Sequence, residues 1–173
     1  MKDLFPKWSF FLISLLAVTA IHARGVYQEP DVFLEEVFQG KVPEVRKLWI
    51  QGELRPEIRN ILGHDLGALR VSYWQRDKRT AWILEEIGKT LPITVGIVVN
   101  DNNIEQVKIL IFRETRGWEV RYPFFTDQFN GRTLADDGEL DEEIDGISGA
   151  TLSVSAVKRL AALALYFHQL VDS

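Results

Sequence analysis

The segment richest in chemically useful residues covers positions 145–153 and reads D-G-I-S-G-A-T-L-S. Gly146, Gly149 and Ala150 let the backbone approach a bulky group closely, because they carry little or no side chain. A helix is expected directly after this segment, and the first turn of a helix offers unpaired N–H donors and a partial positive charge. The segment is therefore a candidate seat for a phosphate group.

A second interpretation of the same residues involves no ligand. Ser148, Thr151 or Ser153 can cap the helix through a side-chain oxygen, which stabilises a helix by about 1 kcal/mol. Any entrance rich in serine and threonine has this capacity. The residues alone leave the phosphate seat and the helix cap both open.

The helix that follows is predicted over Ser153–Val171. Apolar residues recur there at intervals of three and four, which is typical of a helix with one face against a core. Its apolar face should pack on a sheet. The residues at helical spacing are Val154, Val157, Leu160, Ala161, Ala164, Leu165 and His168.

Four β-rich segments precede it, joined by connections too short for crossover helices. Such connections predict neighbouring antiparallel strands, and the turn Asn100–Asn103 has the Asn and Asp residues that a tight hairpin requires. The fold class is therefore α+β, with a mainly antiparallel meander packed by helices. The predicted strands are Arg70–Trp74, Thr80–Ile87, Ile93–Val99 and Ile104–Phe112.

Two short helices are expected nearer the N-terminus. Asp31 resembles an N-cap ahead of an amphipathic stretch that ends before Gly40 and Pro43. A second helix is predicted over Pro56–Leu62, with Gly63 as its stop signal. These helices should pack on the main domain.

The first residues have the pattern of an export signal. An apolar run over 8–21 follows Lys2 and Lys7, and it is shorter than the roughly 20 apolar residues of a spanning helix. We expect cleavage near Ala20 or Ala23, with a short retained anchor or a buried helix as alternatives. The chain then divides into a leader at 1–23, an N-terminal helical segment at 24–68 and a main domain at 69–173.

Composition excludes several classes of protein. The net charge is −5 and the chain has no cysteine, so a nucleic-acid partner, a disulfide framework, a thiolate metal site and an iron–sulfur cluster are not expected. His22, His64 and His168 lie far apart in sequence, without the spacing of metal ligands. Redox chemistry would therefore come from an organic cofactor, with a site of His and carboxylate ligands as the alternative.

The D-G-I-S-G-A-T-L-S segment closely resembles the flavinylation motif of the FMN-binding domain family. That domain occurs in covalently flavinylated subunits of sodium-translocating NADH:quinone oxidoreductase and of the Rnf complex. In the family a flavin transferase moves FMN from FAD onto the last hydroxyl residue. The resemblance implies a covalent FMN phosphoester on Thr151, with Asp145, Ser148, Gly149 and Ala150 as the other matching positions.

Two upstream segments strengthen the resemblance. Residues 114–117 read E-T-R-G, similar to the family's E-T-x-G, and residues 128–131 read Q-F-N-G, similar to its Q-F-x-G. By resemblance, Glu114 and Thr115 lie near the flavin and can hydrogen-bond the ring or the ribityl chain. The alternative is a solvated strand end. One or two of the nearby aromatic residues are expected to contact the ring, and the candidates are Trp118, Tyr122, Phe124, Phe125 and Phe129.

The resemblance implies an exported electron-transfer protein, periplasmic or on the outer face of the cytoplasmic membrane. Its implied partners are a flavin transferase and membrane-bound redox proteins, and Thr151 is an attachment point that takes no part in turnover. The short leader differs from the membrane helix of the flavinylated subunits in those complexes, which argues against membership of such a pump. A non-redox binding module with the same fold and a stand-alone flavin reductase are the alternatives.

Overall fold

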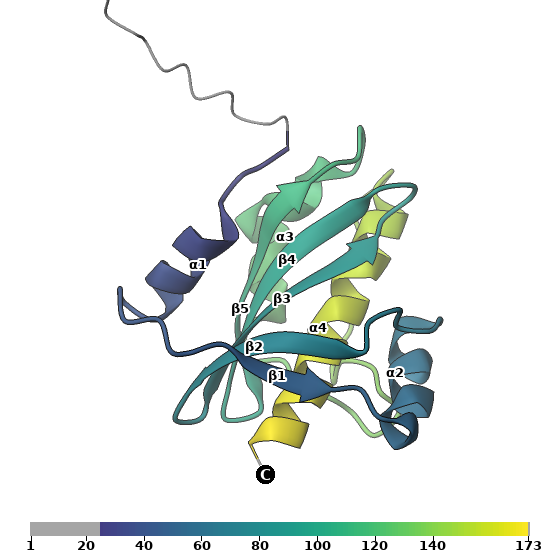
Figure 1. Cartoon of the computed structure of the whole chain (residues 1–173). Helices are drawn as coiled ribbons and strands as arrows, with labels where there is room; N and C mark the ends of the chain where they lie inside the picture. The colour runs from purple at the N-terminus through teal and green to yellow at the C-terminus, as the bar shows by residue number, and fades with distance from the viewer. Residues whose placement is uncertain (1–24, 173) are drawn as a thin grey trace, which may run out of the picture.

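The computed structural model describes residues 25–172, so the predicted leader at 1–23 lies outside the described part of the chain. Its centre is a five-stranded antiparallel sheet in which every strand pairs with the next one along the sequence (Figure 1). The predicted α+β meander is confirmed. The strands are β1 (Arg46–Trp49), β2 (Arg70–Arg76), β3 (Arg79–Ile87), β4 (Pro92–Asn100) and β5 (Asn103–Phe112).

The β4–β5 hairpin forms where the sequence predicts it. Asn100 pairs with Asn103, and the two turn residues Asp101 and Asn102 have φ values of 51° and 64°. These left-handed conformations are the reason that Asn and Asp suit the turn. The hairpin sets the register that brings the end of β5 beside the turn between β3 and β4.

One face of the sheet is covered by the long helix α4 (Thr151–Val171) and by α2 (Arg55–Leu62). Trp82 of β3 is fully buried under this layer, stacked on Tyr73 and tilted against Phe167 of α4. Most of the buried apolar residues belong to this single core. Ala150 and Val154, at the start of α4, belong to the same core, so the first turn of α4 is fixed relative to the sheet.

The other face carries α1 (Pro30–Val37), which lies on the opposite side of the sheet from α4 in Figure 1. Phe33 packs directly on Gly96 of β4, where a Cβ atom would come within 2.7 Å of the Phe33 ring. Residues 25–28 then run beside β5, and the main-chain N–H of Phe112 donates to the carbonyl of Gly25 at 2.7 Å. The chain ahead of α1 is therefore attached near the C-terminal end of β5.

Some elements were not predicted from sequence. β1 adds an edge strand within residues 24–68, and its four mostly exposed residues, two polar followed by two apolar, give no alternating apolar pattern. Three short helices follow β5: η2 (Trp118–Arg121), α3 (Pro123–Thr126) and η3 (Asp127–Phe129). Within residues 25–172, no helix is both long enough and apolar enough to cross a membrane.

A buried histidine joins the far end of α4 to the sheet. The His168 side chain is fully buried, with Nδ1 2.8 Å from the hydroxyl oxygen of Thr80, and the main-chain N–H of Asn102 donates to Nε2 at 3.3 Å. Because Nε2 accepts, the neutral ring carries its proton on Nδ1 and donates to Thr80. A second proton on Nε2 would face the Asn102 N–H group.

This contact predicts a loss of stability in mild acid. Burial lowers the pKa of His168 from its ordinary value of 6.5, and the carboxylates of Asp172 and Asp101 oppose the shift only in part. The unfolded chain therefore binds more protons than the folded one, so the stabilisation is present above about pH 6.5 and lost as the pH falls. We expect the urea unfolding midpoint to decrease from pH 7 to pH 5, and His168→Gln to flatten that decrease.

His64→Gln is the matched control. A hydrogen bond to the carbonyl of Asp65 and the carboxylate of Glu86 raise the pKa of His64 against the effect of burial. Its contribution to stability therefore has the opposite sign and is lost as the pH rises. The control should retain the decrease below pH 6.5, and an equal flattening in both variants would contradict the assignment to His168.

Candidate functional site

A surface hollow of about 360 Å³ opens at the N-terminus of α4. Its walls come from the β3–β4 turn, from the segment that follows β5 and from the start of α4. Five of the seven predicted site residues line it together. They come from two segments that lie more than thirty positions apart in the sequence. They are Glu114, Thr115, Gly149, Ala150 and Thr151.

The other two predicted residues do not line this hollow. Asp145 is exposed, and its main-chain N–H donates to the side-chain oxygen of Gln128 at 2.7 Å. Ser148 is also exposed, one residue ahead of Gly149. Their roles toward a cofactor stay predictions.

The E-T-R-G and S-G-A-T segments meet through a close contact at Gly117. Gly117 has φ +84°, and a Cβ atom there would lie 2.6 Å from Oγ of Ser153 and 3.4 Å from Cβ of Ala150. Glycine is therefore required on two grounds, the left-handed backbone and the lack of space. This contact seats residues 114–116 against the first turn of α4.

The start of α4 has no side-chain cap. Its N-cap residue is Ala150, and no side chain there bonds to the free N–H groups of the first turn. The capping role considered for Ser148, Thr151 and Ser153 is therefore wrong. The exposed Thr151 is the first residue of a 21-residue helix, so the positive end of a long helix faces the hollow.

Two cations that sequence reasoning missed also line the hollow, Lys89 in the β3–β4 turn and Arg116 after β5. Both are exposed, and within residues 25–172 neither side chain has an ion pair or a hydrogen bond. No local pattern in the sequence marks Lys89, because only the meander brings its turn beside Thr151. Free N–H groups, two unpartnered cations and an exposed hydroxyl are suited to a phosphate group.

Glu114 is not a solvated strand end. Its carboxylate accepts main-chain hydrogen bonds from the β3–β4 turn, including those from Lys89 and Leu91 at 2.7 Å. Burial raises the pKa of Glu114, but the hydrogen bonds from Thr90, Leu91 and Lys89 outweigh it and leave the pKa below its usual value. The side chain is therefore an anion held by the turn.

A second hollow of about 380 Å³ adjoins the first, since Glu114 and Thr115 line both. Its aromatic wall includes Tyr27 and Trp118, each 39% exposed. Arg121 lies over both rings, with its guanidinium carbon 4.4 Å from the Tyr27 ring centre and 5.1 Å from that of Trp118. The two hollows together have the size of an ordinary cofactor site.

The remaining aromatic candidates fall into two groups. Phe125 and Phe129 are fully buried and pack edge to face in the core, so they cannot contact a flavin ring. Tyr122 and Phe124 are exposed but line neither of the two hollows. Trp118 is therefore the one predicted aromatic residue that stands in a wall of the site.

The Q-F-N-G segment lines neither hollow and has a structural role. Phe129 is buried, and Gly131 donates its main-chain N–H to the carbonyl of Ile104 on β5 at 2.7 Å. Gln128 holds the backbone of Asp145 through the hydrogen bond described above. This segment thus ties the approach to α4 to the sheet.

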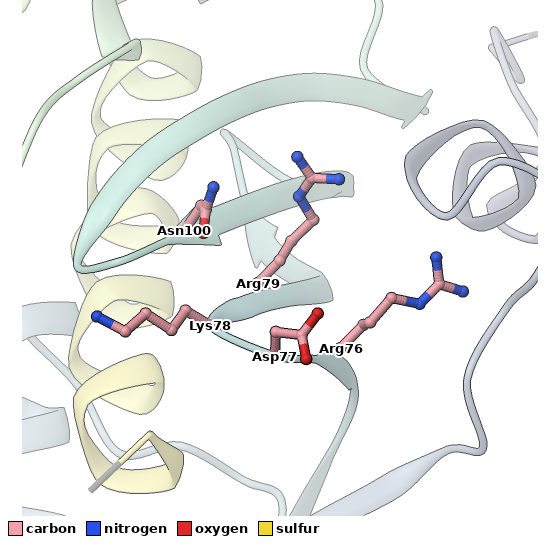
Figure 2. Close-up of a pocket in the computed structure, with 5 residues that line it drawn as sticks. All are labelled: Arg76, Asp77, Lys78, Arg79 and Asn100. Carbon is pink, nitrogen blue, oxygen red and sulfur yellow. The ribbon is translucent and has the colours of Figure 1, made fainter.

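Another hollow lies at the far end of the sheet, lined by Arg76, Asp77, Lys78, Arg79 and Asn100 (Figure 2). Its cations already have partners: Lys78 pairs with Asp101 at 2.6 Å, Arg79 pairs with Glu105 at 2.9 Å, and Arg76 donates to the carbonyl of Phe38 at 3.3 Å. In Figure 2 Lys78 extends away from Arg76, so the charges do not converge. Residues 25–172 contain no group of three His, Cys, Asp or Glu that could hold a metal.

The described part of the chain is a small α+β fold with a hollow at the start of α4. Residues 88–166, a little under half of the chain, match the family model described as the FMN-binding domain, so this segment is similar to that family. The matched region includes β4, β5, the E-T-R-G and Q-F-N-G segments and most of α4. No curated protein and no solved structure matches the chain.

The contact at Gly117 can be tested against Gly149, which has a similar φ of +81° but no atom within 4 Å of an ideal Cβ position. Both Gly117→Ala and Gly149→Ala should lose about 1 kcal/mol to left-handed strain. Gly117→Ala should lose roughly 1 kcal/mol more, because its methyl group overlaps Ser153. Urea unfolding measures the difference, and equal losses would contradict the close contact.

Proposed function

We propose that this protein is an exported electron-transfer flavoprotein that carries FMN covalently, as a phosphoester on Thr151. The observation that carries the proposal is the uncapped N-terminus of α4, where Thr151 stands exposed in a hollow with the unpartnered cations Lys89 and Arg116. A helix end without its own cap leaves donors for a ligand. The family match supplies the identity of that ligand.

The attachment chemistry follows from the family resemblance and uses FAD as donor. Oγ of Thr151 forms a bond to the phosphorus of the FMN half of FAD, and the bond from that phosphorus to the AMP oxygen breaks. AMP leaves, and the hydroxyl proton passes to a base of the flavin transferase or to water. No electron transfer accompanies the step, and the linked phosphate is left as a diester with about one negative charge.

The start of α4 suits that charge. The helix end favours an anion by roughly 0.3 to 1 kcal/mol, and Lys89 and Arg116 add positive charge in the same hollow. Gly149 leaves open space beside Thr151, with no atom within 4 Å of an ideal Cβ. A bulky phosphate substituent therefore meets no steric barrier from this residue.

The adjoining hollow is suited to the flavin ring, whose reversible reduction supplies the redox chemistry when FMN is bound. Tyr27 and Trp118 offer flat apolar surfaces, and Arg121 fixes both rings through cation–π contacts. Aromatic walls with a few polar groups are typical of such sites. Because Glu114 and Thr115 line both hollows, one continuous ligand can extend from Thr151 to Trp118.

Export and electron relay are supported by the rest of the chain. The apolar run at 8–21 behind Lys2 and Lys7 has the pattern of a secretory leader, and a covalent link prevents loss of the cofactor outside the cytoplasm. The sequence has no recognisable nicotinamide site, which favours a carrier over a stand-alone reductase. We propose membrane-bound or periplasmic redox proteins as donor and acceptor.

The covalent link is tested by Thr151→Ala in protein produced together with a flavin transferase. We expect the FMN mass increment in the denatured wild-type protein, its complete loss in Thr151→Ala and partial retention in Thr151→Ser. Because Thr151 does not cap α4, the unfolding midpoint of the alanine variant should change little. Intact-mass spectrometry and urea unfolding make the two measurements.

Ser155→Ala is the control for this experiment, because Ser155 carries a hydroxyl one turn further along α4 and does not line the hollow. It should keep the FMN increment. A colourless wild-type protein, or an increment that persists in Thr151→Ala, would overturn the proposed linkage.

The position of the ring is tested by Trp118→Ala. An indole in contact with a flavin quenches its fluorescence, so the variant should retain covalent FMN and fluoresce more strongly. Phe124→Ala is the matched control, because Phe124 is 61% exposed and lines neither hollow. Equal fluorescence in the two variants would contradict a ring seat at Trp118.

A further inference from the structure

The carboxylate of Glu114 faces the β3–β4 turn. Its Oε1 atom accepts the main-chain N–H groups of all three residues Lys89, Thr90 and Leu91, the first and last at 2.7 Å. Its Oε2 atom accepts the Thr90 hydroxyl at 3.2 Å. Both oxygens are thus engaged by one turn of the chain.

The turn has few other attachments. Lys89, Thr90 and Leu91 are exposed, and the turn is closed by the hydrogen bond from the N–H of Gly88 to the carbonyl of Leu91 at 3.1 Å. The stem of Glu114 also supports it, since its Cγ atom lies 3.5 Å from an ideal Cβ on Gly88. Glu114 is therefore the main link between this turn and the segment after β5.

The hydrogen bonds to Glu114 also reduce the electrostatic repulsion between its carboxylate and a phosphate in the hollow. A carboxylate in the wall of a phosphate site repels the phosphate unless other groups neutralise it. Three N–H dipoles converge on Oε1, and charge-assisted hydrogen bonds of this kind are about twice as strong as neutral ones. The negative charge is thereby directed at the turn, while the same turn brings Lys89 into the lining of the hollow.

We propose that Glu114 is a positioning residue for flavin attachment: it fixes the Lys89–Leu91 turn so that the Lys89 ammonium stands beside Thr151 and neutralises the phosphate. This inference rests on the proposed function. It assigns Glu114 a role toward the turn and not a contact with the flavin ring. Lys89 then contacts the phosphate directly, and Glu114 acts through Lys89.

A double-mutant cycle on the initial rate of flavinylation tests this role, with limiting transferase and FAD and intact mass as the readout. Lys89→Ala and Glu114→Ala should each slow the reaction about tenfold, the size of one charge-assisted hydrogen bond. Because both act through one cation, the double variant should be no slower than Lys89→Ala alone. Glu114→Gln keeps an acceptor oxygen and should recover part of the rate.

Lys41→Ala is the control for a general loss of positive charge, since Lys41 is exposed and lies outside the hollow. It should label at the wild-type rate. A Glu114→Ala variant that slows labelling further in the Lys89→Ala background would overturn the positioning role. A wild-type chain that takes up no FMN would instead overturn the proposed function, and with it the role of Lys89.

Amide hydrogen exchange tests the structural half of the proposal without any flavin. In the flavin-free Glu114→Ala protein the amides of Lys89, Thr90 and Leu91 should exchange faster than in the wild type, while the amides of α4 should not change. Glu114→Gln should show a smaller increase. Unchanged exchange at these three amides would contradict the link between Glu114 and the turn.

Discussion

The site depends on the contact between Gly117 and the first turn of α4. Two of the segments that form its walls, residues 114–117 and the start of α4, lie more than thirty positions apart in the sequence. They approach closely because Gly117 has no side chain where Oγ of Ser153 lies 2.6 Å from an ideal Cβ. The core beneath α4 fixes the position of Ser153, and β5 fixes the position of Gly117. Once this contact is made, Glu114, Thr115 and Arg116 stand beside Thr151, and the helix end opens into a hollow instead of into solvent.

The charges around the hollow make it favourable for an anion. The protein is acidic overall, with a net charge of −5, yet two cations without a partner among residues 25–172, Lys89 and Arg116, line the hollow at the N-terminus of a 21-residue helix. The carboxylate in the wall of the hollow, that of Glu114, is directed at backbone N–H groups. By contrast, the cations of the far hollow in Figure 2 are engaged by partners. An anion is therefore favoured at one end of the sheet and not at the other.

Much of this could be predicted from the sequence, since apolar spacing places β2 to β5 and α4 within a few residues of their observed bounds. β1 could not be predicted, because an exposed edge strand needs no alternation of apolar residues. The motif residues could be identified by resemblance, but Lys89 could not: its turn reaches Thr151 only through the β4–β5 meander. The absence of a cap on α4 also required the structure, because hydroxyl residues at a helix start equally suit capping.

We propose that the flavin phosphate is esterified to the hydroxyl of Thr151 at the start of α4. Phosphorus-31 NMR of the flavin-loaded protein, unfolded in urea and freed of small molecules, tests it most directly. A phosphodiester lacks the second ionisation near about pH 6 of a phosphate monoester. With the phosphoester on Thr151, we expect one retained resonance whose shift does not change across that pH range. A resonance that titrates near pH 6, or the loss of all phosphorus on unfolding, would contradict it.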